Sequence, residues 1–173
     1  MLDHFRMFAG YNAWANARVY DAAAKLSEAE YRDDRGAFFG SMHATLNHLM
    51  LTDGMWRTRL TGEGELRGPL SRIVYDDLAA LRAARGAWDA WMTGWIETLD
   101  EARLASPFGW TRLADGGRVE QPTWAMLGHI FNHQTHHRGQ AHAILSSLRG
   151  PDFAPSLDLP VFQRESGLGW IAQ

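Results

Sequence analysis

The sequence predicts an all-α fold, a four-helix bundle with a long irregular connection before its last helix. Four long segments repeat apolar residues at helical spacing, and stretches containing Gly or Pro separate them. The chain of 173 residues has the length of one domain, and its 46% of apolar residues can fill one core. We therefore expect a single domain over residues 1–173, with a core of about 4–148 and an irregular C-terminal tail over 149–173.

The first two helices are predicted from their apolar spacing and their caps. The first runs from Leu2 to about Leu26, where apolar residues recur three and four positions apart and alanines favour helix. Ser27, three residues before Glu30, can cap a short turn that follows. The second helix is predicted over 41–60, and its first residue is a serine that can open it.

The second half of the chain holds the other two predicted helices. A loop over 61–69 leads to a third helix over about 75–100, whose stripe consists of Leu and Trp. Residues 105–122 are predicted to form an irregular or hairpin-like connection, with a tight turn at "ADGG". The last helix is predicted over about 122–148, because it begins with a proline and Gly150 follows it.

Charge and composition exclude several classes of function. The formal net charge is −3 and no long basic run occurs, which disfavours binding to nucleic acid. No apolar run is long enough to span a membrane and no signal segment is recognisable, so we expect a cytoplasmic protein whose partner is a small-molecule substrate. The chain has no cysteine, so any bound metal must be held by His, Asp, Glu, amide or water ligands.

The segment "HIFNHQTHHRGQAH" (129–142) contains five of the eight histidines. His129, His133 and His137 follow one another at intervals of four, so neighbouring members share a helix face. Two imidazoles one turn apart can both reach one ion, which makes this a metal-binding spacing. A third ligand from another helix would complete a site that keeps one position open for water or substrate.

His48 is the best candidate for the third ligand, because it lies mid-helix among apolar neighbours. The alternative is that His48 is a hydrogen-bonded core residue. His43 is the rival ligand, but it lies five residues away and points about 140° from His48. His129 is either a core residue or a supporting one, and His136 is expected to face away or to lie at the edge.

Other site chemistries fit the sequence poorly. "HQTHH" has the two-histidine frame of the H-E-x-x-H metalloproteases, but Gln134 replaces the catalytic glutamate. No Glu-x-x-His pair supports a di-iron site, and no phosphate-binding or serine-hydrolase motif occurs. The acceptor for a ligating histidine is Gln140, Asn132, Asp53 or a backbone carbonyl. Arg138 is expected to make a structural salt bridge rather than to orient an anionic substrate.

Three sequence blocks resemble the DinB-like (damage-inducible, YfiT-like) proteins: "YNAWAN", "TLNHLMLTDGMW" and "GHIFNHQTHHRGQ". The resemblance covers about residues 4–148, and its most specific part is the histidine pair followed by Arg-Gly-Gln. It implies a four-helix bundle with one divalent metal ion, most often nickel or zinc, on His48, His133 and His137. It also implies a homodimer and, where family activities are known, metal-dependent transferases and isomerases that use low-molecular-weight thiols.

The resulting hypothesis is a metal-dependent enzyme that transfers or adds a low-molecular-weight thiol to a small electrophilic substrate. Because the chain has no thiol of its own, a thiol would have to be a co-substrate. One alternative is a metal-dependent hydrolase of a small molecule. Another is a non-catalytic bundle that binds a metal or a ligand. The sequence assigns no catalytic acid or base.

Overall fold

The computed structural model describes residues 1–64 and 68–169. The chain is mostly helical with a small two-stranded sheet. The elements, in chain order, are α1 (Leu2–Ala23), α2 (Glu28–Arg32), α3 (Met42–Thr61), α4 (Leu78–Glu97), α5 (Glu101–Ala105), β1 (Pro107–Thr111), β2 (Arg118–Pro122), α6 (Thr123–Arg149), the 3-10 turn η1 (Pro151–Phe153) and α7 (Leu159–Ser166). None of the described helices is both long and apolar enough to cross a membrane.

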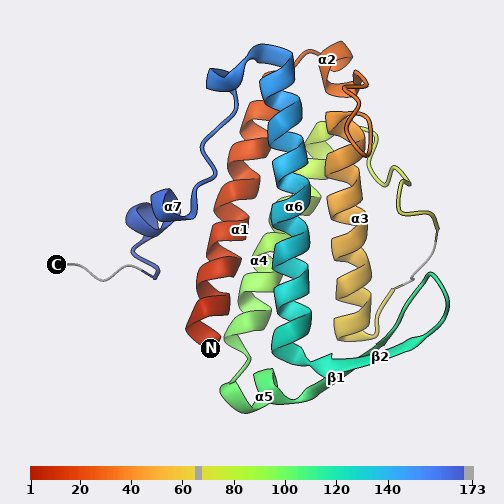
Figure 1. The fold of residues 1–173 in the computed structure, drawn as a ribbon, viewed down its shortest axis with the longest axis vertical. Coiled ribbons are helices and arrows are strands. Elements are labelled where there is room, and N and C mark those ends of the chain that lie inside the picture. The colour runs from red at the N-terminus through yellow and green to blue at the C-terminus, as the bar shows by residue number, and fades with distance from the viewer. Residues whose placement is uncertain (65–67, 170–173) are drawn as a thin grey trace.

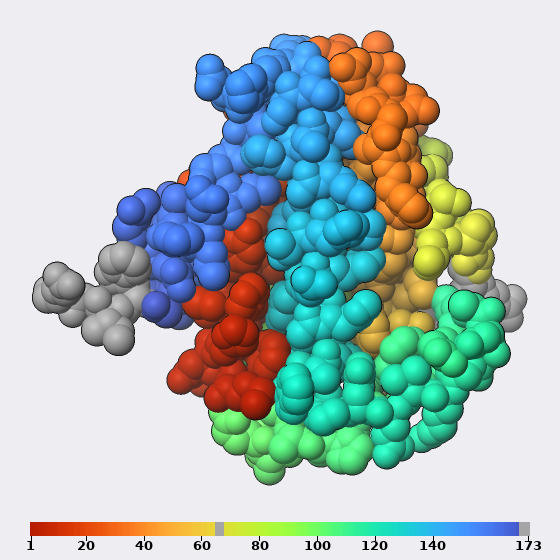
Figure 2. All heavy atoms as spheres, in the orientation of Figure 1, coloured from red at the N-terminus to blue at the C-terminus, as the bar shows by residue number. Residues whose placement is uncertain are grey.

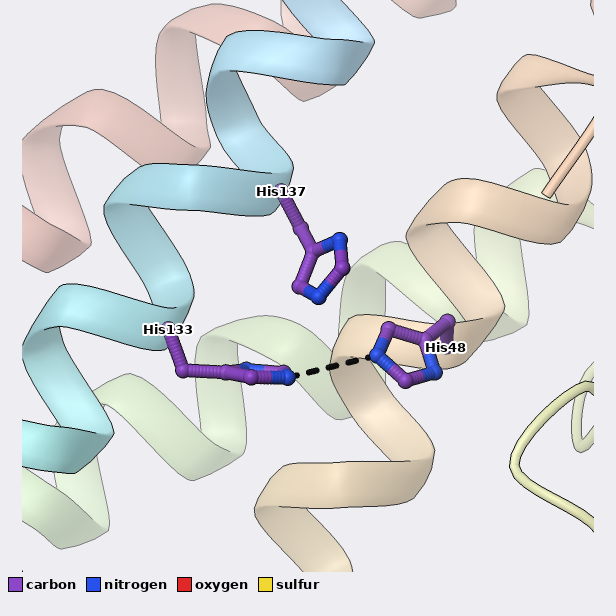
Figure 3. Close-up of side chains that lie close together, drawn as sticks. All are labelled: His48, His133 and His137. Carbon is purple, nitrogen blue, oxygen red and sulfur yellow. Dashed lines mark hydrogen bonds between the residues drawn. The ribbon is translucent and has the colours of Figure 1, made fainter. Parts of the chain in front are cut away.

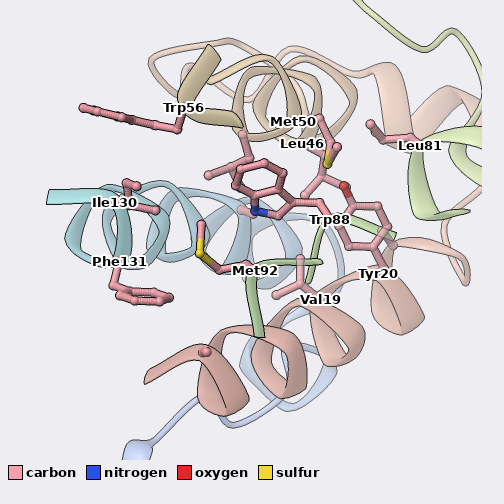
Figure 4. Close-up of a cluster of buried hydrophobic side chains, with 14 of the residues drawn as sticks. Val19, Tyr20, Leu46, Met50, Trp56, Leu81, Trp88, Met92, Ile130 and Phe131 are labelled. Atoms are coloured by element: carbon pink, nitrogen blue, oxygen red, sulfur yellow. The ribbon is translucent and has the colours of Figure 1, made fainter. Parts of the chain in front are cut away.

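The four long helices α1, α3, α4 and α6 lie side by side, and α6 runs in the direction opposite to α3 (Figure 1). Helix α1 packs against α4 and α6, and α3 packs against α6 and α4. Their apolar faces meet in one buried cluster, part of which Figure 4 shows. The labelled members are Val19, Tyr20, Leu46, Met50, Trp56, Leu81, Trp88, Met92, Ile130 and Phe131.

Side-chain caps set where the predicted helices begin. The Ser41 hydroxyl accepts a hydrogen bond from the backbone N–H of Ala44 at 3.1 Å, so α3 begins next to the predicted position. Helix α4 begins at Leu78, later than predicted, because the Asp77 carboxylate caps it through the N–H of Ala80 at 2.7 Å. The expected cap at Ser27 is present as a full capping box before the short helix α2.

The connection predicted over 105–122 is a β-hairpin that follows the short helix α5, which the sequence did not reveal. Strands β1 and β2 are antiparallel, and Gly109 lies opposite Glu120. Gly116 has a φ of +70° in the turn, as the "ADGG" sequence predicts. The hairpin lies across the ends of α3 and α6 (Figure 1).

The tail was expected to be irregular, and this expectation is wrong for residues 159–166, which form α7. The reason is tertiary: Phe162 is buried against α1, with its ring centroid 5.9 Å from that of Tyr11. A Cβ atom at Gly10 would lie 3.0 Å from the Phe162 ring, so this glycine permits the close approach. Eight residues give too little periodicity to reveal a helix whose stability depends on one buried contact.

Candidate metal centre

Three of the predicted histidines come together between α3 and α6. His48 points from α3 toward His133 and His137 on α6 (Figure 3). Each of the three can offer one ring nitrogen such that these atoms all lie within 4.8 Å of one another. The Nε2 atoms of His48 and His133 are 3.3 Å apart. Two imidazole nitrogens bound to one tetrahedral ion are separated by about 3.3 Å, so this spacing fits a shared ion.

Two of the rings are oriented by acceptors on their far side. The Nδ1 of His48 lies 2.8 Å from the backbone carbonyl oxygen of Leu70, and the Nδ1 of His137 lies 2.7 Å from the Oε1 of Gln140. Because a carbonyl oxygen only accepts, both Nδ1 atoms carry the proton and both Nε2 atoms have a free lone pair. Gln140 and a backbone carbonyl are thus the supporting acceptors, and the other candidates do not serve. In this tautomer, with the proton on Nδ1, the Nε2 atom is free to bind a metal ion.

Burial keeps the imidazoles neutral. Desolvation lowers the pKa of His48 to about 4 and, with smaller effects from the neighbouring histidines, that of His133 to about 3. Desolvation also lowers the pKa of His137. These shifts favour the neutral form of all three imidazoles, so protons compete weakly with a metal ion.

The surroundings of the histidines are apolar on one side and more open on another. The Phe39 ring stacks on His48, with centroids 3.9 Å apart and planes at 23°, and lies 5.4 Å from the His137 ring. This ring belongs to the segment before α3, which lies beside α6 in Figure 2 (orange). His48 and His137 are buried, whereas His133 is only half-buried. The donor set of three neutral nitrogens fits a divalent ion such as zinc or nickel, with a position left for a further ligand.

A second polar cluster lies on the inner side of the same helices. The Asp53 carboxylate, 1% exposed, accepts hydrogen bonds from Arg85 and, at 2.6 Å, from the Nε2 of Gln134. Arg85 also bonds both carboxylate oxygens of Asp89, at 2.8 and 3.1 Å. Asp53 therefore joins helices α3, α4 and α6 and does not contact the histidines, which excludes it as their acceptor.

Arg138 belongs to this second cluster. Its guanidinium donates to the side-chain oxygens of Asn12 and Asn16, and both asparagines donate to Asp89. The expected salt bridge is absent, because no carboxylate of residues 1–64 or 68–169 lies within ion-pair distance of Arg138 and two amide oxygens take that place. At 2% exposure, Arg138 is not placed to orient a substrate.

Sequence reasoning missed most of this cluster. Asn12 and Asn16 stand one helical turn apart in "YNAWAN", and Arg85 and Asp89 stand one turn apart on the apolar stripe of α4. Polar pairs at that spacing on a buried face were the available signal. We refer to Asn12, Asn16, Asp53, Arg85, Asp89, Gln134 and Arg138 as the buried network.

The remaining histidines lie outside the cluster of three. His43 is buried at 4% exposure, but it packs on Tyr31, with ring centroids 5.2 Å apart, and faces away from His48 as the helix geometry predicts. His129 is exposed and its ring lies 6.0 Å from that of His133. His136 is exposed, and Asn132, also exposed, lines a groove with Phe5, away from the histidines.

Comparison with known proteins identifies one family. The model of the DinB family matches residues 1–150, which is most of the chain and includes all three clustered histidines. Searches of curated proteins and of solved structures gave no match.

Proposed function

This chain belongs to the DinB family, and from that premise we propose that its four long helices form a four-helix bundle in which His48, His133 and His137 bind one divalent metal ion, zinc or nickel. We propose further that the protein is an enzyme that transfers or adds a low-molecular-weight thiol to a small electrophile. One observation carries the proposal: three neutral imidazoles converge, and the Nδ1 protons of His48 and His137 leave the Nε2 lone pairs of these two rings for a metal ion.

The residues around the three histidines have different roles in the proposed reaction. A divalent ion held by three imidazoles lowers the pKa of a thiol or water bound beside it. Leu70 and Gln140 fix the rings of His48 and His137 through their Nδ1 protons, and Phe39 excludes water from the face of His48. The half-buried side of His133 is the direction from which small molecules enter. The nucleophilic sulfur has to come from a co-substrate, because the chain contains no cysteine.

The position of Gln134 supports thiol transfer over hydrolysis. In the H-E-x-x-H metalloproteases the residue after the first histidine is the glutamate that activates water. Here that residue is Gln134, which is 1% exposed and donates to Asp53 in the buried network. The side chain is neither a base nor directed at the histidines. A thiol needs no such base once its proton is lost, since the thiolate is itself the nucleophile.

The test is conjugation of a thiol to a model electrophile by untagged protein loaded with zinc or nickel. The reaction forms a carbon–sulfur bond, expels a halide from an aryl or alkyl halide and releases the thiol proton. We expect the rate to require metal and thiol together, to fall by about a hundredfold or more in His133→Ala, and to persist in His136→Ala. His136 is the matched control because it is an exposed histidine on the same helix.

Three results would contradict the proposal. No acceleration by any of cysteine, glutathione, bacillithiol or mycothiol, with metal fully loaded, would exclude thiol transfer. Metal-dependent ester hydrolysis without thiol would point to a hydrolase instead. Metal binding that only raises the melting temperature would indicate a non-catalytic protein.

A further inference from the structure

A charged residue outside the two clusters, Arg59, lies on α3 toward the hairpin. The guanidinium carbon of Arg59 is 4.5 Å from the ring centroid of Trp56 and 4.5 Å from that of Trp110 on β1. The two indole rings contact each other edge to face at 5.3 Å. Trp56 marks the edge of the apolar cluster in Figure 4, and its ring extends outward from it. Arg59 is half-buried and packs against both rings.

Two hydrogen-bond donors, on Arg59 and Trp110, lack acceptors among the described residues. Arg59 Nε and Trp110 Nε1 are both buried, and neither has a hydrogen-bond partner within residues 1–64 and 68–169. The one acceptor near the Arg59 guanidinium is the Thr111 carbonyl, 3.5 Å from Nη2, at the limit of a hydrogen bond. Leaving buried donors unpaired costs stability, so two of them side by side indicate a missing acceptor.

Among the described residues, the charge of Arg59 also has no partner. No carboxylate in the described part of the chain lies within ion-pair distance of it, whereas the buried Arg85 pairs with both Asp53 and Asp89. Desolvation without a compensating anion lowers the pKa of Arg59. A half-buried cation in this state is stabilised by any anion that reaches it.

This feature is continuous with the histidine cluster. The His129 ring lies 5.3 Å from Trp56 and 6.0 Å from His133. Desolvation lowers the pKa of the His129 imidazole, and the nearby charge of Arg59 lowers it further. His129 and His133 are one turn apart on α6, about 6 Å along its axis. A surface thus runs from His133 past the exposed His129 to the guanidinium.

We propose that Arg59, packed against Trp56 and Trp110, binds the anionic end of a substrate or thiol whose reacting end lies at His48, His133 and His137. The substrate class is therefore an organic anion carrying a carboxylate or phosphate, with its charge separated from its reacting atom by a spacer. The proposal rests on the proposed function. The two indole rings lie on adjoining sides of the guanidinium, because their centroids are only 5.3 Å apart, and the remaining side leaves N–H donors for a planar or tetrahedral anion.

The test compares ω-mercaptocarboxylates with ω-mercaptoalcohols of the same chain length, over a series of increasing length. Binding to the cobalt-loaded protein is followed by the thiolate-to-cobalt absorption band. In the wild type we expect the carboxylate to bind about tenfold more tightly than the alcohol at the length that spans the two ends, and equally at shorter lengths. Arg59→Gln should abolish this preference without changing the metal content.

Two variants separate anion binding from a structural role. Arg57→Gln removes the same charge from an exposed position on the same helix and should keep the preference. Arg59→Lys keeps the charge without the guanidinium fork, so the preference should persist in weakened form. If Arg59→Gln does not fold, the carboxylate preference of Arg59→Lys is compared with that of the wild type instead. A residue that only held the hairpin in place would change stability, but not the selectivity between carboxylate and alcohol.

Failure of this proposal differs from failure of the proposed function. Equal binding of carboxylate and alcohol at every length would overturn the anion subsite, while thiol binding itself would still support the proposed function. If no thiol binds, the proposed function fails and thiol-free alkyl carboxylates become the probe. Quenching of tryptophan fluorescence by these carboxylates that is lost in Arg59→Gln would then support the subsite. Equal quenching in both proteins would overturn it.

Discussion

The histidine cluster and the buried network share helices α3 and α6, yet their chemistry is opposite. His133 is followed by Gln134, and His137 by Arg138, so consecutive residues of α6 enter different sites. In the buried network, two arginines and two aspartates balance their charges, and amide side chains join them. In the histidine cluster, three neutral rings bring one nitrogen each within 4.8 Å of the others.

This difference separates a structural site from a binding site. Most polar groups of the buried network satisfy one another, which fixes how the helices pack, although Arg138 Nε and Gln134 Oε1 have no hydrogen-bond partner within the described residues. The Nε2 atoms of His48 and His133 lie 3.3 Å apart, and a proton on His133 Nε2 or a cation between the two atoms can join the rings. The histidine cluster therefore keeps nitrogen donors that a metal ion can use.

The largest expected effect is loss of the metal. His133→Ala or His48→Ala should lower the bound divalent ion from about one per chain to background, because two imidazoles hold an ion far more weakly than three. Elemental analysis of untagged protein gives the readout. Thermal unfolding of metal-free His133→Ala should be close to that of the metal-free wild type, since His133 is only half-buried, whereas His48→Ala should also lose the packing of His48 on Phe39. A variant that keeps its full metal content would remove that histidine from the ligand set.

The second-largest expected effect is the loss of stability when the buried network loses its arginine. Arg85→Met should lower the free energy of unfolding by about 3–5 kcal/mol, because it leaves Asp53 and Asp89 buried without their cation. Chemical denaturation of the metal-free protein measures it. Arg82→Met is the matched control: Arg82 pairs with Asp21 at the surface, so its loss should cost about 1 kcal/mol or less. Equal costs for the two variants would show that the buried network is not structural.

The smallest expected effect concerns the support of one ligand. Gln140→Leu removes the acceptor of the His137 Nδ1 proton and should weaken metal binding by about 10- to 100-fold, without abolishing it. Competition with a chromogenic chelator provides the measurement. Gln140→Glu retains an acceptor oxygen and should bind at least as tightly as the wild type. Unchanged affinity in Gln140→Leu would mean that the orientation of His137 does not depend on this contact.

Much of the site was predictable from sequence because its signal is local. Histidines at intervals of four on a helix share a face whatever the rest of the chain does, and the spacing of His133 and His137 follows from helix geometry alone. The helices themselves follow from apolar periodicity and from caps such as Ser41. The mid-helix position of His48 among apolar neighbours favoured it over His43, and the family resemblance implied the same residue, although both are buried to nearly the same degree.

By itself, then, the sequence determined the long helices, the shared face of His133 and His137, and membership of the DinB family. The tertiary structure alone decided that Asp53 pairs with Arg85, that Arg138 meets amide oxygens, and that residues 159–166 form a helix. The physical reason is the distance along the chain over which each interaction acts. Periodicity and capping act within a few residues, whereas a buried charge takes its partner from whichever helix packs beside it, and that is fixed only when the whole core is formed.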